Sequence, residues 1–165
     1  MTKRRLVIGI DPDVDKSGVA VIDLHSGEMN LMSLTFAEMM IFFQSFKDDK
    51  SVEVIVEAGW MVKKSNYHAV YGSAGQRVAK NVGENHRRGK DIVDMLEALN
   101  IPHREVLPLR KSWRGQGRKI THEEFCQICS YKGRTNQETR DAGLLAWINA
   151  DMPLNIRNRD KKTIK

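Results

Sequence analysis

The sequence predicts an α/β fold, with a mixed sheet of five strands and helices on both of its faces. Strand-like runs at residues 6–10, 18–24 and 29–34 follow one another with only short polar turns between them, which is typical of an antiparallel meander. A helical segment then leads into the β-branched run at 52–58, whose continuous apolar character favours a central strand covered on both faces. Helical and strand-like segments alternate after it, so we expect the order βββ-α-β-α-β-α-α.

The helix before the central strand has clear start signals. Thr35 can cap it, Glu38 occupies the capping-box position, and apolar side chains continue to about Phe46. A helix in this place supplies the crossover that a parallel neighbour of the first strand requires. We therefore expect the first and fourth strands to lie side by side, with the acids that follow them at neighbouring strand ends.

Residues 59–81 are basic, aromatic and Gly-containing, and this composition favours a functional loop that runs into a helix start. The helix itself should then continue to about Leu99, before the Asn and Pro that follow. Its apolar stripe either packs in the core or forms part of a dimer interface. The stripe consists of Ile92, Val93, Leu96 and Leu99.

The last third of the chain should hold one more strand and two more helices. The expected segments are a strand at 103–109, a basic segment at 110–119, a helix from the Thr121 cap with Glu124 in the capping box, and a final helix at 136–149. The length suits one domain, which we place at residues 1–152. Residues 153–165 are expected to form a basic, disordered tail.

The chain has 165 residues, a net charge of +6 and a pI of about 9.4, which favours polyanionic partners. No run approaches the ~20 apolar residues of a membrane span, and the first residues lack the pattern of a signal peptide. We therefore expect a soluble cytoplasmic protein with no membrane partner. Cys126 and Cys129 form a lone C-x-x-C pair, to which we assign a structural role rather than a zinc site.

Four acidic residues occur where apolar segments end or begin: Asp11, Glu57, Glu138 and Asp141. Any one of them alone could be a turn former, a strand-end charge or a helix-start acid. A cluster of all four would repel itself without cations. Hard oxygen ligands suit Mg²⁺, for which Mn²⁺ can substitute, and two such ions support phosphoryl transfer. The sequence therefore predicts a two-metal site in which Asp11 bridges both ions.

These motifs resemble those of the RuvC-like Holliday junction resolvases of the RNase H-like superfamily, including versions carried by phages or mobile elements. The run GIDP at 9–12 is similar to the family's opening signature, and E-x-x-D-A at 138–142 is similar to its closing D-x-x-D-A. The likeness spans about residues 6–150. It implies an RNase H-like fold and metal-dependent cleavage of DNA.

The sequence departs from the family pattern in three places. Glu138 stands where Asp is usual, Asp13 and Asp15 add acids to the turn after the first strand, and residues 66–81 are longer than the typical connection. Asp13 and Asp15 are interpreted as turn formers, with metal contact as the alternative. These departures bear on substrate geometry more than on the reaction.

A basic segment with two glycines could follow a phosphate chain closely. It contains Arg110, Lys111, Arg114, Arg118 and Lys119. We expect DNA contacts here, helped by the tryptophan within the segment, and the alternative is a solvated charged surface. The G-x-G run at 115–117 followed by Lys119 resembles a family loop, which implies that Lys119 is the catalytic cation beside the scissile phosphate.

A second candidate DNA surface follows the central strand. Trp60, Lys63 and Lys64 resemble the family's E-x-x-aromatic pattern with its downstream basic residue. Trp60 either stacks on an unpaired base at a junction centre or packs as a core residue beneath the loop. Lys63 and Lys64 would hold flanking phosphates, with Arg87 and Arg88 as weaker candidates.

The resulting hypothesis is a Mg²⁺-dependent crossover junction endodeoxyribonuclease that cuts four-way junctions by paired nicks. Because a junction has two symmetric strands to cut, we expect the enzyme to act as a C₂ homodimer. A ribonuclease or other nuclease of the same fold, acting on RNA–DNA hybrid or branched DNA, is an alternative because the acids do not encode sugar identity. A non-catalytic nucleic-acid-binding module is another, which the intact acid set disfavours. An actin-like kinase fits poorly, because the chain lacks a second phosphate loop.

Overall fold

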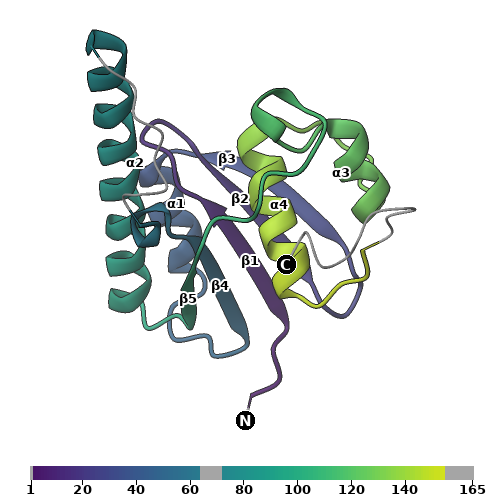
Figure 1. Ribbon diagram of the computed structural model, residues 1–165. Coiled ribbons are helices and arrows are strands. Elements are labelled where there is room, and N and C mark those ends of the chain that lie inside the picture. Colours follow the sequence, from purple (N-terminus) through teal and green to yellow (C-terminus); the bar gives the residue numbers. More distant parts are fainter. Residues whose placement is uncertain (1, 64–71, 155–165) are drawn as a thin grey trace.

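A computed structural model describes residues 2–63 and 72–154, which fold around a mixed sheet in the order β3-β2-β1-β4-β5 (Figure 1). The strands of this sheet are β1 (Leu6–Asp11), β2 (Ser17–Asp23), β3 (Met29–Leu34), β4 (Val52–Glu57) and β5 (His103–Val106). The helices are α1 (Phe36–Gln44), α2 (Gly72–Ala98), α3 (His122–Cys129) and α4 (Gln137–Asn149), with short 3₁₀ turns η1 (Gly59–Met61) and η3 (Gln116–Arg118). The predicted fold class and element order are confirmed.

The pairing of β1 sets the position of the first two acids. β1 runs antiparallel to β2 and parallel to β4, with Ile10 opposite Val56. Asp11 and Glu57 are the next residues of the two strands, so their side chains leave the sheet at adjacent carboxyl ends. The expectation that the first and fourth strands are neighbours is therefore correct.

Alternation along β1 divides the core between the two faces of the sheet. Ile8 and Ile10 face α1 and α2, and are fully buried with Leu96 of α2. Val7 points to the opposite face, where it packs with residues of α3 and α4. Helices thus cover both faces, α1 and α2 on one and α4 with α3 on the other (Figure 1).

Two glycines allow α4 to lie directly on the sheet. A Cβ atom at Gly9 of β1 would clash with the carbonyl oxygen of Ala142, and a Cβ at Gly18 of β2 would clash with that of Glu138. The first turns of α4 therefore contact the backbone of β1 and β2 closely, which no larger residue would permit. This contact places Glu138 and Asp141 beside the carboxyl end of β1.

The capping boxes expected at Thr35 and Thr121 are both formed, and Asn136 caps α4 in the same way. The expected loop at 59–81 is wrong over its second half, because α2 begins at Gly72. The side chains of residues 72–80 are almost all exposed, so this part of the helix has no apolar periodicity to reveal it.

The structure decides one alternative and corrects one expectation. The apolar stripe of α2 is buried against the sheet and α1, so the core alternative is confirmed and the stripe is not available as a dimer interface. The strand expected at 103–109 ends at Val106, because Pro108 lacks the N–H donor that a longer ladder needs.

Among the described residues, no helix combines the length and the apolar character needed to cross a membrane. The expected tail falls outside the described residues from position 155 onward.

Candidate active site

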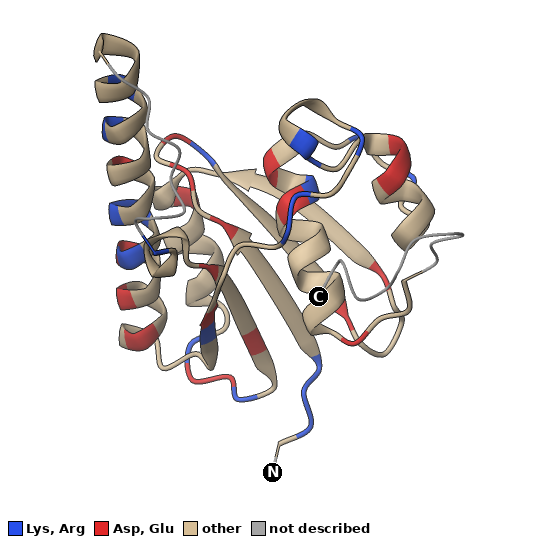
Figure 2. Cartoon of the chain, in the orientation of Figure 1, with Lys and Arg blue, Asp and Glu red and all other residues tan. Residues whose placement is uncertain are grey.

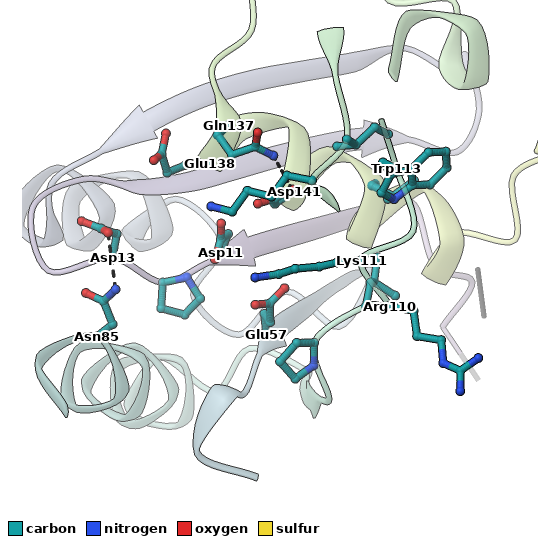
Figure 3. A pocket seen from close by; sticks show the side chains of 16 residues that line it. Asp11, Asp13, Glu57, Asn85, Arg110, Lys111, Trp113, Gln137, Glu138 and Asp141 are labelled. Atoms are coloured by element: carbon teal, nitrogen blue, oxygen red, sulfur yellow. Dashed lines mark hydrogen bonds between the residues drawn. The ribbon is translucent and has the colours of Figure 1, made fainter. Parts of the chain in front are cut away.

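A cavity of about 190 Å³ opens at the carboxyl ends of β1 and β4. The start of α4 and the loop after β5 complete its wall (Figure 3). Its polar lining consists of Asp11, Asp13, Glu57, Asn85, Arg110, Lys111, Lys119, Gln137, Glu138 and Asp141. The four acids that the sequence singled out therefore line one cavity, although they lie up to 130 residues apart in the chain, from Asp11 to Asp141.

The acids do not all take the same position. Asp11, Glu57 and Asp141 face a common space, whereas Glu138 extends away from it (Figure 3). The electrostatics agree, since Glu138 contributes least of the three neighbouring acids to the raised pKa of Asp11. Three carboxylates thus form the centre of the cluster and Glu138 lies at its rim.

Burial and mutual repulsion both act on these carboxyl groups. Burial, followed by the charges of Glu57 and Asp141, raises the pKa of Asp11 well above its usual value. The same causes, burial first and then Asp141, raise the pKa of Glu57 to about 7. Burial also raises the pKa of Asp141, although a hydrogen bond from Gln137 opposes the shift. Without cations, the cluster therefore holds its protons more tightly than exposed acids do.

Two lysines partly offset the negative charge. The Lys111 side chain extends between Asp11 and Glu57 (Figure 3), and its charge lowers the pKa of Glu57 and Asp141. Lys119 lowers the pKa of Asp11, Glu57 and Asp141 alike. Their ammonium groups stabilise the ionised acids, but burial outweighs them at Asp141, and burial together with repulsion outweighs them at Asp11 and Glu57.

The loop that carries Lys119 is held by backbone hydrogen bonds. The N–H of Trp113 donates to the carbonyl of Arg118 over 3.0 Å, and the N–H of Gly115 donates to that of Lys119 over 2.9 Å. Glu124, the capping-box residue of α3, accepts a hydrogen bond of 3.2 Å from the N–H of Arg114. The loop is therefore fixed to the first turn of α3.

We compared the chain with known proteins. No protein-family model and no curated protein matches it. Among solved structures, it is similar to RuvC of T. thermophilus in complex with a Holliday junction substrate, with a TM-score of 0.50 and 13% sequence identity. The alignment covers 92% of this chain and 99% of that one.

The chain has a RuvC-like fold. At this identity the likeness shows the architecture of the RNase H-like class and does not assign the chain to a particular family. The sequence resemblance and the structural one agree on that architecture.

The remaining basic candidates divide into two groups within this RuvC-like fold. Arg110 lines the cavity beside Lys111. Arg114 and Arg118 lie on the exposed side of the same loop, outside the cavity lining. Trp113, which was expected to help bind DNA, is instead buried, with 8% of its surface exposed, and packs in the core beside α3 and α4. The side chain that was expected to touch DNA thus anchors the loop from inside.

Trp60 lies apart from the cavity, in η1 between β4 and α2. Its ring packs against Gly89, where a Cβ atom would clash with the ring carbons. Its indole N–H donates to Glu105 over 3.1 Å, and its ring meets His86 edge-on. These contacts favour the interpretation that Trp60 packs against α2 as part of the protein interior. Base stacking by Trp60 stays a prediction. Lys63 is exposed, and Lys64 lies outside the described residues.

Two polar residues of the cavity escaped the sequence analysis. The Gln137 amide donates to Asp141 Oδ1 over 2.8 Å and so orients that carboxylate. Asn85 of α2 accepts from the N–H of Val14 over 2.9 Å and contacts Asp13 (Figure 3). Asp13 itself accepts from the N–H of Asp15, as expected of a turn former. The i, i+4 spacing of Gln137 and Asp141 was readable, whereas the contact from α2 was not.

The donor set fits a hard divalent cation in its chemistry. Asp11, Glu57, Glu138 and Asp141 offer carboxylate oxygens, the ligands that Mg²⁺ and Mn²⁺ prefer. Burial raises the pKa of all three central acids, and neighbouring carboxylates raise those of Asp11 and Glu57 further. In the part of the chain that the structure describes, however, no three His, Cys, Asp or Glu side chains are grouped in an arrangement that could hold one ion. Cation binding would therefore require these side chains to turn toward each other.

Proposed function

We propose that this protein is a metal-dependent, structure-selective DNA endonuclease that resolves four-way junctions by paired nicks. The observation that carries the proposal is the convergence of carboxylates from β1, β4 and α4, with two lysines, on one cavity of a RuvC-like fold. That neighbour was solved with a Holliday junction substrate, which supports branched DNA as the substrate class.

Each polar group of the cavity has a role in this proposal. Asp11, Glu57, Glu138 and Asp141 would hold two Mg²⁺ ions, which supply an activated water and stabilise the leaving oxygen when bound. The Gln137 amide keeps Asp141 oriented through its hydrogen bond. Lys119 would place a fixed positive charge beside the scissile phosphate, where charge develops in the transition state.

The DNA-binding surface would extend from the cavity along the basic loop. Arg110 and Lys111 would contact phosphates next to the site, and Arg114 and Arg118 would contact phosphates farther out. Lys63, Lys64 and Trp60 are the proposed contacts on the β4 side. Two symmetric nicks need two active sites, so the active species would be a C₂ homodimer.

The decisive experiment incubates the purified protein with labelled four-way junction, linear duplex and RNA–DNA hybrid, in Mg²⁺ or in EDTA. We expect Mg²⁺-dependent nicks in the junction and little cleavage of the linear duplex. Preferential cleavage of the hybrid would support a ribonuclease of the same fold instead. Junction binding without cleavage of any substrate would support a non-catalytic module.

Substitutions test the metal ligands. Asp11→Asn, Glu57→Gln and Asp141→Asn should each abolish cleavage and leave junction binding intact or stronger, because each removes a ligand and a repulsive charge. Asp15→Asn, in the exposed turn after β1, is the matched control and should cleave normally. Titration calorimetry with Mg²⁺ gives a readout that does not depend on activity. Full cleavage by any of the three ligand variants would reject the assignment.

A further inference from the structure

Basic and acidic residues lie close together where the loop after β5 meets the start of α4 (Figure 2). One arginine of α4, Arg140, contacts three positions around this meeting point. Its Nε donates to the carbonyl of Ile120 over 3.1 Å, and its Nη1 donates to the Thr135 hydroxyl over 2.9 Å. Its Nη2 donates to Gln137 Oε1 over 3.1 Å. All three acceptors are uncharged, and the planar fork of a guanidinium can serve them at once.

The neighbouring helices do not depend on this arginine for their caps. Asn136 and Thr139 form the capping box of α4, and Thr121 and Glu124 form that of α3. Each helix start therefore has its own side-chain cap. Placing a half-buried guanidinium among uncharged acceptors carries a desolvation cost, so the contacts of Arg140 call for a function other than capping.

Arg140 determines which way the Gln137 amide faces. A guanidinium only donates hydrogen bonds, so the end of the amide beside Arg140 has to be the oxygen. The NH₂ end then faces Asp141, to which it donates over 2.8 Å (Figure 3). A reversed amide would present its oxygen to the carboxylate and its NH₂ group to the guanidinium, so both hydrogen bonds would be lost.

The effect of Arg140 on Asp141 passes through this hydrogen bond. Burial raises the pKa of Asp141, and among the groups that oppose the shift the Gln137 hydrogen bond acts most strongly and the charge of Arg140 least. The hydrogen bond engages Asp141 Oδ1, and it thereby sets the direction in which Oδ2 points. Arg140 thus acts on this carboxylate by fixing its partner rather than by its own charge.

We propose that Arg140 is a positioning residue of the active site with two functions. Through Gln137 it keeps Asp141 oriented toward a cation, and through the carbonyl of Ile120 it holds the end of the basic loop (residues 110–119). Lys119, the proposed catalytic cation, directly precedes Ile120. One guanidinium therefore sets the spacing between a metal ligand and a catalytic ammonium group from different segments. The inference rests on the proposed function and adds to it the residue that aligns these two parts.

The first function is tested by titration calorimetry of the full chain with Mn²⁺, in the absence of DNA. Arg140→Lys keeps the charge but cannot reach three acceptors at once, and Gln137→Met keeps the side-chain length but cannot donate. Each should raise the Mn²⁺ dissociation constant at least about tenfold. The double variant should bind as Gln137→Met alone does, because Arg140 acts on Asp141 through Gln137. Arg134→Lys, in the exposed segment before α4, is the matched control and should bind as the wild type does.

The second function is tested by amide hydrogen exchange without metal or DNA. The N–H groups of Trp113 and Gly115 are hydrogen-bonded within the basic loop. They should exchange at least about twofold faster in Arg140→Lys, which loses the hydrogen bond that holds the end of the loop. Exchange should be unchanged in Gln137→Met. At saturating Mg²⁺, Gln137→Met should also recover more of its cleavage rate than Arg140→Lys, since only Arg140→Lys releases the loop.

The possible failures can be told apart. If the wild type binds Mn²⁺ and cuts junctions but both variants keep its dissociation constant, the positioning of Asp141 is refuted and the proposed function stands. A double variant that binds more weakly than Gln137→Met would refute the action through Gln137. Equal loop exchange in Arg140→Lys and the wild type would refute the contact with Ile120. A wild type that binds no Mn²⁺ would refute the proposed function and the orientation of a metal ligand together, whereas loop exchange would still decide the second function.

Discussion

Glu57→Gln should stabilise the metal-free protein at alkaline pH. Burial, followed by the charge of Asp141, raises the pKa of Glu57 from 4.5 to about 7. A carboxyl whose pKa is raised on folding favours the folded state fully below its unfolded pKa, and that contribution is lost as the pH rises through the folded pKa. A shift from 4.5 to about 7 corresponds to at most about 3 kcal/mol. The loss should occur between about pH 4.5 and pH 7.

Glutamine has nearly the same shape as glutamate and carries no charge, so the Glu57→Gln variant avoids the free-energy cost of ionising a buried carboxyl. Thermal unfolding in EDTA is the measurement, at about pH 5 and pH 8. At pH 8 the variant should melt up to about 6–12 °C above the wild type, given 2–4 °C per kcal/mol for a domain of this size. At pH 5 the difference should be much smaller, because Glu57 is then still protonated in the folded wild type.

Glu53 on the same strand provides a control of opposite sign. Its burial opposes ionisation, but hydrogen bonds from Arg4 and Arg104 outweigh burial and lower its pKa. Glu53→Gln should therefore destabilise the protein at pH 8. If Glu57→Gln were no more stable at pH 8 than the wild type, the cost of ionising a carboxyl at this buried position beside Asp141 would be refuted.

Three further predictions concern single side chains. Trp60→Ala should cost about 3–5 kcal/mol of stability, measured by urea unfolding, because the Trp60 ring packs against α2. An unchanged unfolding midpoint together with poor junction cleavage would instead support base stacking. Gly18→Ala should lower the melting temperature and the cleavage rate together, because its Cβ would push the start of α4 off the sheet; a variant with wild-type melting would contradict the close contact. Lys119→Ala should slow single-turnover cleavage at saturating junction, whereas Arg118→Ala should mainly reduce the salt dependence of junction binding by about one unit of slope. Equal effects of these two changes on the cleavage step would contradict a separate catalytic role for Lys119.

The sequence predicted correctly those features that depend on residues close together in the chain. Capping boxes at Thr35 and Thr121 could be read from spacing alone, and both are present. The crossover helix before β4 implied that β1 and β4 pair in parallel, and this adjacency placed Asp11 beside Glu57. The adjacency of Asp11 and Glu57 thus followed from topology, whereas the approach of Glu138 and Asp141 depends on how closely α4 packs on the sheet.

What the sequence did not reveal depends on long-range packing. The start of α2 at Gly72 has no apolar stripe, because its side chains face solvent on nearly every side. Trp113 was expected to bind DNA because it lies in a basic run, but whether a tryptophan points inward depends on what α3 and α4 place beneath it. The position of Lys111 between two acids likewise requires a loop and two strand ends to meet.

The order of the acids along the chain affects when the site can exist. Asp11 and Glu57 are within the first 57 residues of the sequence, whereas Glu138 and Asp141 are near its end. The latter two reach the cavity only when α4 lies on Gly9 and Gly18. During synthesis, a nascent chain therefore carries half of the carboxylates without the other half until the ribosome has released α4. Incomplete chains and fragments cut before α4 would lack Glu138 and Asp141, so the complete carboxylate cluster exists only in molecules that contain α4.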